Sequence, residues 1–292
     1  MWEFVYVAPQ SIDEAVAELR RGDGRPLAGG TDLLPQLREG RRSPDRIVDL
    51  KRIVELGSVQ SRPDGGVEIG AAISATRVAR HETIAGAYPA IAASARLIGA
   101  VQVQNRASLG GNVCNAAPSA DAVPALICYE ARAHIAGPNG RRQLPLEAFF
   151  LGPGKTVLEP GELLVSLVLP PVVQRSATTY LRFTPRREMD IAVAGVAVRL
   201  DLAEDLSLSL ARIALASVGP TPLRALAAEQ ILQGKRLDRD LAAAAARAAA
   251  EAARPISDTR ASADYRRSLV EVLTRRALAS CAQSLKLGLD PL

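Results

Sequence analysis

The sequence predicts an α+β protein in which a larger mixed part is followed, from about residue 175, by a smaller α+β part. Short apolar runs alternate with short amphipathic segments up to Pro171, where the texture changes. Two β-rich segments and then two Ala-rich helical segments follow, at 190–202, 207–217, 239–253 and 263–284. Strands first and helices last is the order expected when helices cover one face of an antiparallel sheet.

The first part shows its elements through caps and turn residues. Ser11 followed by Glu14 predicts a helix start, with Ala15, Val16 and Leu19 on one face. A helical pattern from Thr76 to about residue 98 is broken near Gly86 and Pro89. Asp121 is expected to cap a helix that runs to residue 128. The segment 102–112 is polar and contains glycine, and its part 107–112 is expected to be a loop. Strands are expected at 25–28, 46–50, 66–70, 131–136 and 163–168.

Composition excludes several classes of protein. The 292 residues are 48% hydrophobic and 23% charged, the balance of a globular chain. The net charge is +5 and the pI about 9.4, yet the basic residues are interleaved with acidic ones, so no nucleic-acid partner is expected. No apolar run approaches the ~18 residues of a membrane span. The first residues lack the pattern of a signal peptide, and we expect a cytoplasmic protein.

The cysteines and histidines offer no metal site. Cys114, Cys128 and Cys281 are odd in number and widely spaced, which argues against disulfides and against a bound iron–sulfur cluster. His81 and His134 have no partners at metal-ligand spacing. We therefore expect no metal ligand in this chain and no Ser, Cys or His motif for a catalytic acid, base or nucleophile.

Two glycine pairs are the candidates for ligand binding. In the first, the apolar run Leu27-Ala28 enters Gly29-Gly30 and a helix start at Thr31-Asp32. Such a turn presents consecutive N–H groups to an anion such as a pyrophosphate. A plain strand-to-helix turn explains the same pattern, and both interpretations stay open.

The second pair is Gly110-Gly111, beside Ser108 and Asn112, with Asn115, Ser119 and Asp121 following. Taken alone, this segment too is compatible with a structural loop. Together, the two loops are suited to embrace one extended dinucleotide from two sides. Neither matches G-x-G-x-x-G, which disfavours a Rossmann site, and no phosphate-binding P-loop motif occurs.

These loops and several further phrases resemble the FAD-binding subunit of the molybdenum hydroxylases, the family of xanthine dehydrogenase and carbon monoxide dehydrogenase. The resemblance covers nearly the whole chain, in order. The further phrases are Val101 to Arg106, Asn112 to Asp121, Pro160 to Leu164, Pro185 to Ala192 and Ala261 to Arg267.

The resemblance implies a PCMH-type FAD-binding domain over 1–175, with lobes of about 1–57 and 58–175, and a C-terminal α+β domain over 176–292. It implies a cofactor site at Ala28, Gly29, Gly30, Thr31, Asp32, Leu33, Ile98, Ser108, Gly110, Gly111, Asn112, Asn115, Asp121, Leu164 and Arg182. Asp121 would take a hydroxyl of FAD. Ile98 and Arg182 stand where the animal xanthine enzymes carry phenylalanine and lysine, which leaves the contacts of these two residues with the flavin open.

The resemblance also implies a function. FAD, bound without a covalent link, would pass electrons from an iron–sulfur subunit to NAD, a quinone or oxygen. A small iron–sulfur subunit and a large molybdopterin subunit would be partners, with two such heterotrimers paired. Two alternatives stay open, namely a self-contained flavin-dependent reductase or oxidase of related fold and a flavin-free scaffold. Arg186-Arg187-Glu188 is either a surface ion-pair cluster or a feature near the flavin, and Asp190 is expected to form a turn.

Overall fold

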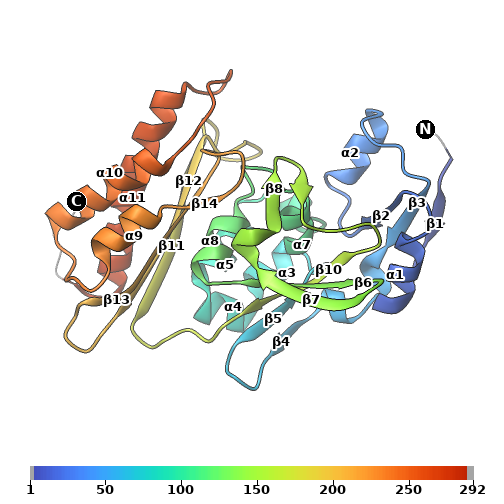
Figure 1. Cartoon of the computed structure of the whole chain (residues 1–292), viewed down its shortest axis with the longest axis horizontal. Coiled ribbons are helices and arrows are strands. Elements are labelled where there is room, and N and C mark those ends of the chain that lie inside the picture. Colours follow the sequence, from blue (N-terminus) through green and yellow to red (C-terminus); the bar gives the residue numbers. More distant parts are fainter. Residues whose placement is uncertain (1–2, 288–292) are drawn as a thin grey trace.

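The computed structural model describes residues 3–287, in which three sheet-based bodies lie side by side in chain order (Figure 1). The N-terminal body, blue in Figure 1, and the C-terminal body, yellow to red, flank a central body. The combination of mixed sheets and helices confirms the predicted α+β class. None of the helices within residues 3–287 combines the length and apolar character needed to cross a bilayer.

The N-terminal body is a small parallel sheet in the order β1-β3-β2. Its elements are β1 (Val5–Val7), α1 (Ile12–Leu19), β2 (Gly24–Leu27), α2 (Leu33–Arg38) and β3 (Arg46–Asp49). The Ser11 hydroxyl accepts the Glu14 N–H at 3.2 Å, so the predicted cap of α1 is confirmed. Helix α1 buries its apolar face, including Ala15 and Leu19, against this sheet and the end of the central one.

The central body is an antiparallel sheet in the order β4-β5-β10-β6-β7. Its strands are β4 (Val59–Ser61), β5 (Val67–Gly70), β6 (Arg132–Gly137), β7 (Gly140–Pro145) and β10 (Leu163–Leu169), and the hairpin β8 (Phe150–Gly152) and β9 (Lys155–Thr156) stands apart. Strand β10 is buried along its whole length because it lies in the middle of the sheet. The strands expected at 66–70, 131–136 and 163–168 are confirmed.

Six short helices accompany this sheet. They are α3 (Ala75–Arg80), α4 (Glu82–Ala87), α5 (Pro89–Ala95), α6 (Val101–Gln104), α7 (Leu109–Cys114) and α8 (Ala122–Cys128). Pro89 opens α5, as expected, but the earlier break falls at His81, and Gly86 lies inside α4. The segment 107–112, expected to be a loop, contains the start of α7, so that prediction is wrong, and the polar segment before it contains most of α6. The Ser108 hydroxyl caps α7 by accepting the Gly111 N–H at 3.0 Å, and helix follows despite the glycines.

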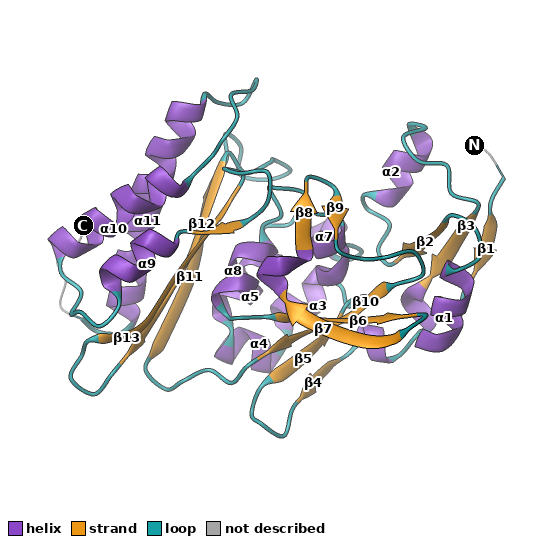
Figure 2. Cartoon of the chain, viewed as in Figure 1, coloured by secondary structure: helices purple, strands orange, loops and turns teal. Residues whose placement is uncertain are grey.

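The C-terminal body confirms the order of strands first and helices last. Its elements are β11 (Ser176–Phe183), β12 (Ala194–Leu202), β13 (Leu208–Ala216), β14 (Leu223–Arg224), α9 (Leu226–Leu232), α10 (Arg239–Ala252) and α11 (Ala263–Ser284). The sheet runs β11-β12-β13-β14, and the long helices cover one face (Figure 2). Helices α5 and α8 meet the other face, where Tyr180, Ala197 and Ala214 join the central core. Burial on both faces explains why every residue of β12 is buried.

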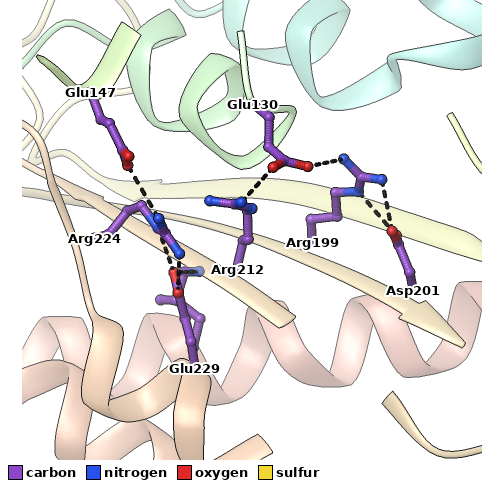
Figure 3. A network of polar contacts seen from close by, with 8 residues as sticks. Glu130, Glu147, Arg199, Asp201, Arg212, Arg224 and Glu229 are labelled. Carbon is purple, nitrogen blue, oxygen red and sulfur yellow. Dashed lines mark hydrogen bonds and ion pairs between the residues drawn. The ribbon is translucent and has the colours of Figure 1, made fainter. Parts of the chain in front are cut away.

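A row of ion pairs lies along the seam between the central and C-terminal bodies (Figure 3). Glu130, just after α8, accepts a hydrogen bond from Arg212 at 2.5 Å and lies 3.7 Å from Arg199. Arg199 in turn forms a two-point contact with Asp201, at 2.9 and 2.7 Å. Charged groups of both bodies are therefore neutralised against one another at the seam.

Candidate cofactor site

A cleft of about 690 Å³ opens where the N-terminal and central bodies meet. One wall comes from β2 and the start of α2. The opposite wall comes from the stretch between residues 98 and 121, which contains α6 and α7. Leu164 of β10 and Met189 of the loop before β12 also line the cleft. The cleft thus gathers segments that are far apart in the sequence.

The first wall presents unpaired backbone donors. Strand β2 ends at Leu27, and Gly30 turns the chain with a φ of +77°. Helix α2 then begins with Asp32 as its N-cap, whose side chain makes no capping bond. Within the part of the chain that the structure describes, the N–H groups of residues 29–33 find no protein acceptor. Grouped N–H donors at a turn form a concavity suited to phosphate oxygens.

Gly29 is required for a contact between the two walls. A β-carbon placed on it would lie 1.9 Å from the Arg106 carbonyl oxygen and 2.4 Å from the carbonyl carbon. The first loop therefore packs backbone to backbone on the segment before α7. The sequence predicted close approach of a ligand at this glycine, and the structure shows close approach of another stretch of the chain.

In the second wall, the N–H groups of Gly110 and Gly111 already donate to acceptors within the protein. The Gly110 N–H donates to Ala71 O at 3.0 Å, and the Gly111 N–H donates to the Ser108 hydroxyl. What the wall offers the cleft is side-chain chemistry and a bare surface at Gly111, where an added β-carbon would meet only the Ser108 Oγ. The buried Asn112 Oδ1 has no protein partner. A buried acceptor without a partner calls for a donor from a bound molecule or water.

Taken together, the walls fit an extended ligand with both phosphates and hydrogen-bond donors. The N–H groups of residues 29–33 suit a diphosphate. The Asn112 Oδ1 suits a ligand hydroxyl or ring N–H, and buried Ile98 and Leu164 suit a flat ring. FAD combines these groups in one molecule. Among residues 3–287 no three His, Cys, Asp or Glu side chains gather as metal ligands.

Comparison with known proteins decides the family. Residues 2–172 match the FAD binding domain in molybdopterin dehydrogenase, and residues 179–281 match the CO dehydrogenase flavoprotein C-terminal domain. This chain belongs to the molybdopterin dehydrogenase flavoprotein family. The resemblance read from its motifs is thereby confirmed, and so is FAD as the family's cofactor.

Two curated relatives illustrate the match to the flavoprotein family. The carbon monoxide dehydrogenase medium chain of Hydrogenophaga pseudoflava is 36% identical over 286 residues, covering 96% of this chain and 98% of the relative. The putative xanthine dehydrogenase FAD-binding subunit of Escherichia coli K12 is 34% identical over 254 residues, covering 87% of each.

Solved structures agree. The carbon monoxide dehydrogenase from Hydrogenophaga pseudoflava that lacks the Mo-pyranopterin moiety of its cofactor superposes with a TM-score of 0.92 at 35% identity, covering 97% of this chain and 98% of its own. Quinoline 2-oxidoreductase from Pseudomonas putida 86 gives a TM-score of 0.90 at 30% identity, with the same coverage.

The flavoprotein's predicted site residues fall together, with one exception. The cleft is lined by Ala28, Gly29, Gly30, Thr31, Asp32, Leu33, Ile98, Ser108, Gly110, Gly111, Asn112, Asn115, Asp121 and Leu164. Arg182 is not among its lining residues. The Arg182 side chain is 6% exposed and lies behind Asp121, to which it donates a hydrogen bond at 2.5 Å.

Asp121 does not cap α8 through its side chain, contrary to the sequence prediction. Its two carboxylate oxygens are occupied instead by Tyr180 Oη at 2.9 Å and by Arg182 Nη1 at 2.5 Å. Burial raises the pKa of Asp121 to about 6, although Arg182 and Tyr180 both act to lower it. With a pKa of about 6 the carboxyl group is mostly ionised at neutral pH, and its two partners favour that charged form against the effect of burial.

Several cleft residues of the flavoprotein were missed by the sequence analysis. Arg42 donates from Nε to Gln36 Oε1 at 2.6 Å, and Gln36 Nε2 lies 3.5 Å from Asn115 Oδ1. Met189 reaches the cleft from a loop whose motif was noted without a role for this residue. No periodicity or cap in the sequence singles out Gln36, which lies within α2, or Arg42, which lies in the connection after α2. Only the folded chain shows that they line the cleft.

The loop before β12 carries Arg186, Arg187 and Glu188, for which the sequence left open a surface cluster or a place near the flavin. The Asp190 carboxylate accepts the N–H groups of Arg186 and Ile191, both at 2.9 Å, so the expected turn is confirmed. Arg187 and Glu188 are exposed, whereas Met189, Asp190 and Ile191 line the cleft. The charged triplet thus faces solvent, and the residues after it face the cofactor site.

Proposed function

We propose that this chain is the FAD-binding electron-transfer subunit of a molybdenum-containing hydroxylase complex. The observation that carries the proposal is the cleft, where unpaired N–H groups at residues 29–33 face Ser108, Asn112 and the bare surface of Gly111. Membership of the flavoprotein family supports it. The absence of a metal-ligand group within residues 3–287 is compatible with molybdopterin and iron–sulfur clusters on partner subunits.

The roles of the residues follow from their chemistry. The N–H groups of residues 29–33 would hold the diphosphate of FAD, and Ser108, Asn112 and Asn115 would bind it from the other side. Ile98 and Leu164 would exclude water from the rings. Bound FAD supplies the exchange between one- and two-electron transfer, while the chain supplies position and electrostatics. Within this scheme the FAD-binding domain is 1–175, with lobes 1–57 and 58–175, and the C-terminal domain is 176–292.

The partners follow from the relatives, several of which are named as medium chains or subunits of dehydrogenases. We propose a small iron–sulfur subunit as the electron donor and a large molybdopterin subunit as the site of substrate oxidation. Two such heterotrimers would pair, and the complex would work in the cytoplasm. The chain alone then contains a relay without a source of electrons.

The first prediction is that purified protein binds FAD without a covalent link. No cleft-lining residue is a histidine, and burial raises the pKa of the Cys114 thiol in the cleft to about 12, so it is not a reactive thiolate at neutral pH. Acid denaturation should therefore release free FAD, measured by absorbance and chromatography. Flavin that stays attached to the denatured chain would contradict non-covalent binding, and a chain that takes up no FAD at all would favour a flavin-free scaffold.

The second prediction is that the chain alone oxidises no hydroxylase substrate. It should accept electrons slowly from NADH or a dye through its flavin, but it should not turn over a purine, an aldehyde, an aromatic heterocycle or carbon monoxide. Purification from the native host should yield the chain with its two partners, and the complex should be active. Turnover by the single chain would instead establish the self-contained flavoenzyme.

A further inference from the structure

The end of the second wall of the cofactor cleft, residues 117–121, is held in place by the C-terminal body. The Ser217 N–H, at the end of β13, donates to the Pro118 carbonyl at 2.7 Å. From β11, Tyr180 Oη reaches Asp121 Oδ1 at 2.9 Å, and Arg182 Nη1 reaches Asp121 Oδ2 at 2.5 Å. These three bonds make the position of Asp121 depend on a sheet whose β11 side chains do not themselves line the cleft.

Tyr180 and Arg182 of β11 lie opposite small residues of β12, which leave room for their side chains. Tyr180 is 5% exposed, and it lies opposite Ala197 of β12, while Arg182 lies opposite Gly195. A β-carbon on Gly195 would lie 2.5 Å from Tyr180 Oη, so the glycine leaves room for the hydroxyl that bonds Asp121. Replacing that glycine would push the hydroxyl away from the carboxylate.

Helix α11 holds the backbone at Ser217, whose N–H donates to the Pro118 carbonyl. The buried Arg266 donates from Nη1 to Val193 O at 2.7 Å and to Ser217 O at 3.1 Å. Its Nη2 donates to Asp258 at 2.7 Å. Arg266 thereby fixes the backbone at Ser217, which in turn holds Pro118 beside the cleft.

The Asp121 carboxylate retains acceptor capacity for a ligand. Each of its oxygens has two lone pairs, and the protein uses one on each oxygen. The group lines the cleft, so the remaining lone pairs are available to a hydroxyl of the cofactor. A hydrogen bond to an ionised acceptor is roughly twice as strong as one to a neutral acceptor.

We propose that Arg182 and Tyr180 are positioning residues that hold the Asp121 carboxylate toward bound FAD, so that the C-terminal domain tunes the cofactor site through Asp121. Neither side chain needs to touch FAD for this effect. The inference rests on the proposed binding of FAD in this cleft. It assigns to Arg182 an indirect role in place of the direct flavin contact that the sequence left open.

The test is the pH dependence of FAD affinity, followed by flavin fluorescence from about pH 5 to about pH 8.5. In the wild-type protein the Asp121 contribution should be present above its pKa of about 6 and lost as the pH falls through that value. Removing the charge in Arg182→Met leaves only the Tyr180 hydrogen bond to oppose the effect of burial on the Asp121 pKa. The midpoint should then move up by at least about one pH unit, and a one-unit shift should weaken binding at pH 7 by roughly twofold, because about half of the Asp121 carboxyl groups would then be protonated.

Companion variants separate positioning from a general loss of structure. Arg182→Lys keeps the charge and should restore most of the wild-type profile, whereas Tyr180→Phe should give a smaller upward shift. Asp121→Asn should remove the step near pH 6 that comes from Asp121. Arg212→Met is the matched control, because it removes an arginine of the same sheet that pairs with Glu130 and does not line this cleft.

The remaining titratable groups of the cleft act equally in all variants. Partial desolvation raises the pKa of Asp32, and the N–H groups of Arg186 and Ile191 lower that of Asp190. The decisive readout is therefore the shift between variants. Equal midpoints in the wild type, Arg182→Met and Tyr180→Phe would overturn the inference, and Tyr180→Phe decides it if Arg182→Met does not fold. A wild-type protein that binds no FAD at any pH would refute the proposed function instead.

Discussion

Gly29→Ala should weaken FAD binding by at least about tenfold, equivalent to ~1.4 kcal/mol. The new methyl group would lie 1.9 Å from the Arg106 carbonyl oxygen, and the obstacle is backbone that cannot rotate away. The loop must move off the segment before α7, which displaces the N–H groups of residues 29–33 from the opposite wall. Overpacking of this kind also costs about 1–3 kcal/mol of folding free energy. Titration with FAD and urea unfolding would measure the two effects.

Gly86→Ala is the matched control for this substitution. Gly86 lies inside α4, and an added β-carbon would find no atom within 4 Å. The exchange should leave FAD affinity unchanged and should stabilise the protein by roughly 0.5–1 kcal/mol, because alanine is the better helix former. If folded Gly29→Ala binds FAD as tightly as the wild type, the first loop is a structural turn and the diphosphate lies elsewhere.

Arg199→Met should lower the free energy of unfolding by about 3–5 kcal/mol. Arg199 and Asp201 are 3% and 4% exposed, and the arginine contacts both carboxylate oxygens. Without Arg199, the buried Asp201 keeps the Ser176 hydroxyl at 2.6 Å as a side-chain donor, and its charge is left uncompensated. Urea unfolding at neutral pH would measure the loss.

The double variant Arg199→Met/Asp201→Leu tests the cause. It removes the stranded carboxylate together with its partner, so most of the lost stability should return. Neither residue lines the cofactor cleft, so FAD affinity of the folded variants should match the wild type. A single variant as stable as the wild type would show that the pair is not compensated in the way its geometry indicates.

The sequence predicted the elements whose signals are local. Ser11 marks its helix through its own hydroxyl, and the apolar run at β10 is buried from end to end. Strand β11 escaped prediction because its side chains, such as Thr178 and Arg182, show neither an apolar run nor a clear alternation. It is a strand because each of its residues pairs with β12, a contact that no window of sequence contains.

The second glycine pair shows how packing overrides propensity. Glycine disfavours helix, so Gly110-Gly111 indicated a loop. Yet a β-carbon on Gly110 would lie 2.5 Å from Ala71, and a larger residue would prevent α7 from seating against the end of β5. The small size of the residue, and not its freedom of rotation, is what this position requires.

The sequence predicted many of the residues that line the cofactor cleft, but it did not predict the contacts that hold those residues in place. The family motifs pointed to residues that gather in one cleft, because each motif is a continuous phrase of sequence. The hydrogen bond from Arg182 to Asp121 joins a residue outside these phrases to one inside them, and so does the hydrogen bond from the Met189 N–H to Gly99 O. Relations of this kind follow only from the packing of the three bodies.

The hydrogen bond from the Ser217 N–H to Pro118 O has a consequence for the order in which the protein folds and binds FAD. A ribosome delivers the chain from its N-terminus, and domains generally fold as they emerge. The glycine-containing walls therefore appear early, but the segment that carries Asp121 gains its supports only after β11 and β13 have been made. We expect the nascent first domain to hold FAD weakly and the finished chain to hold it firmly. Flavin loading would then be a late step of assembly, and the supply of loaded subunit would depend on how fast the C-terminal sheet folds.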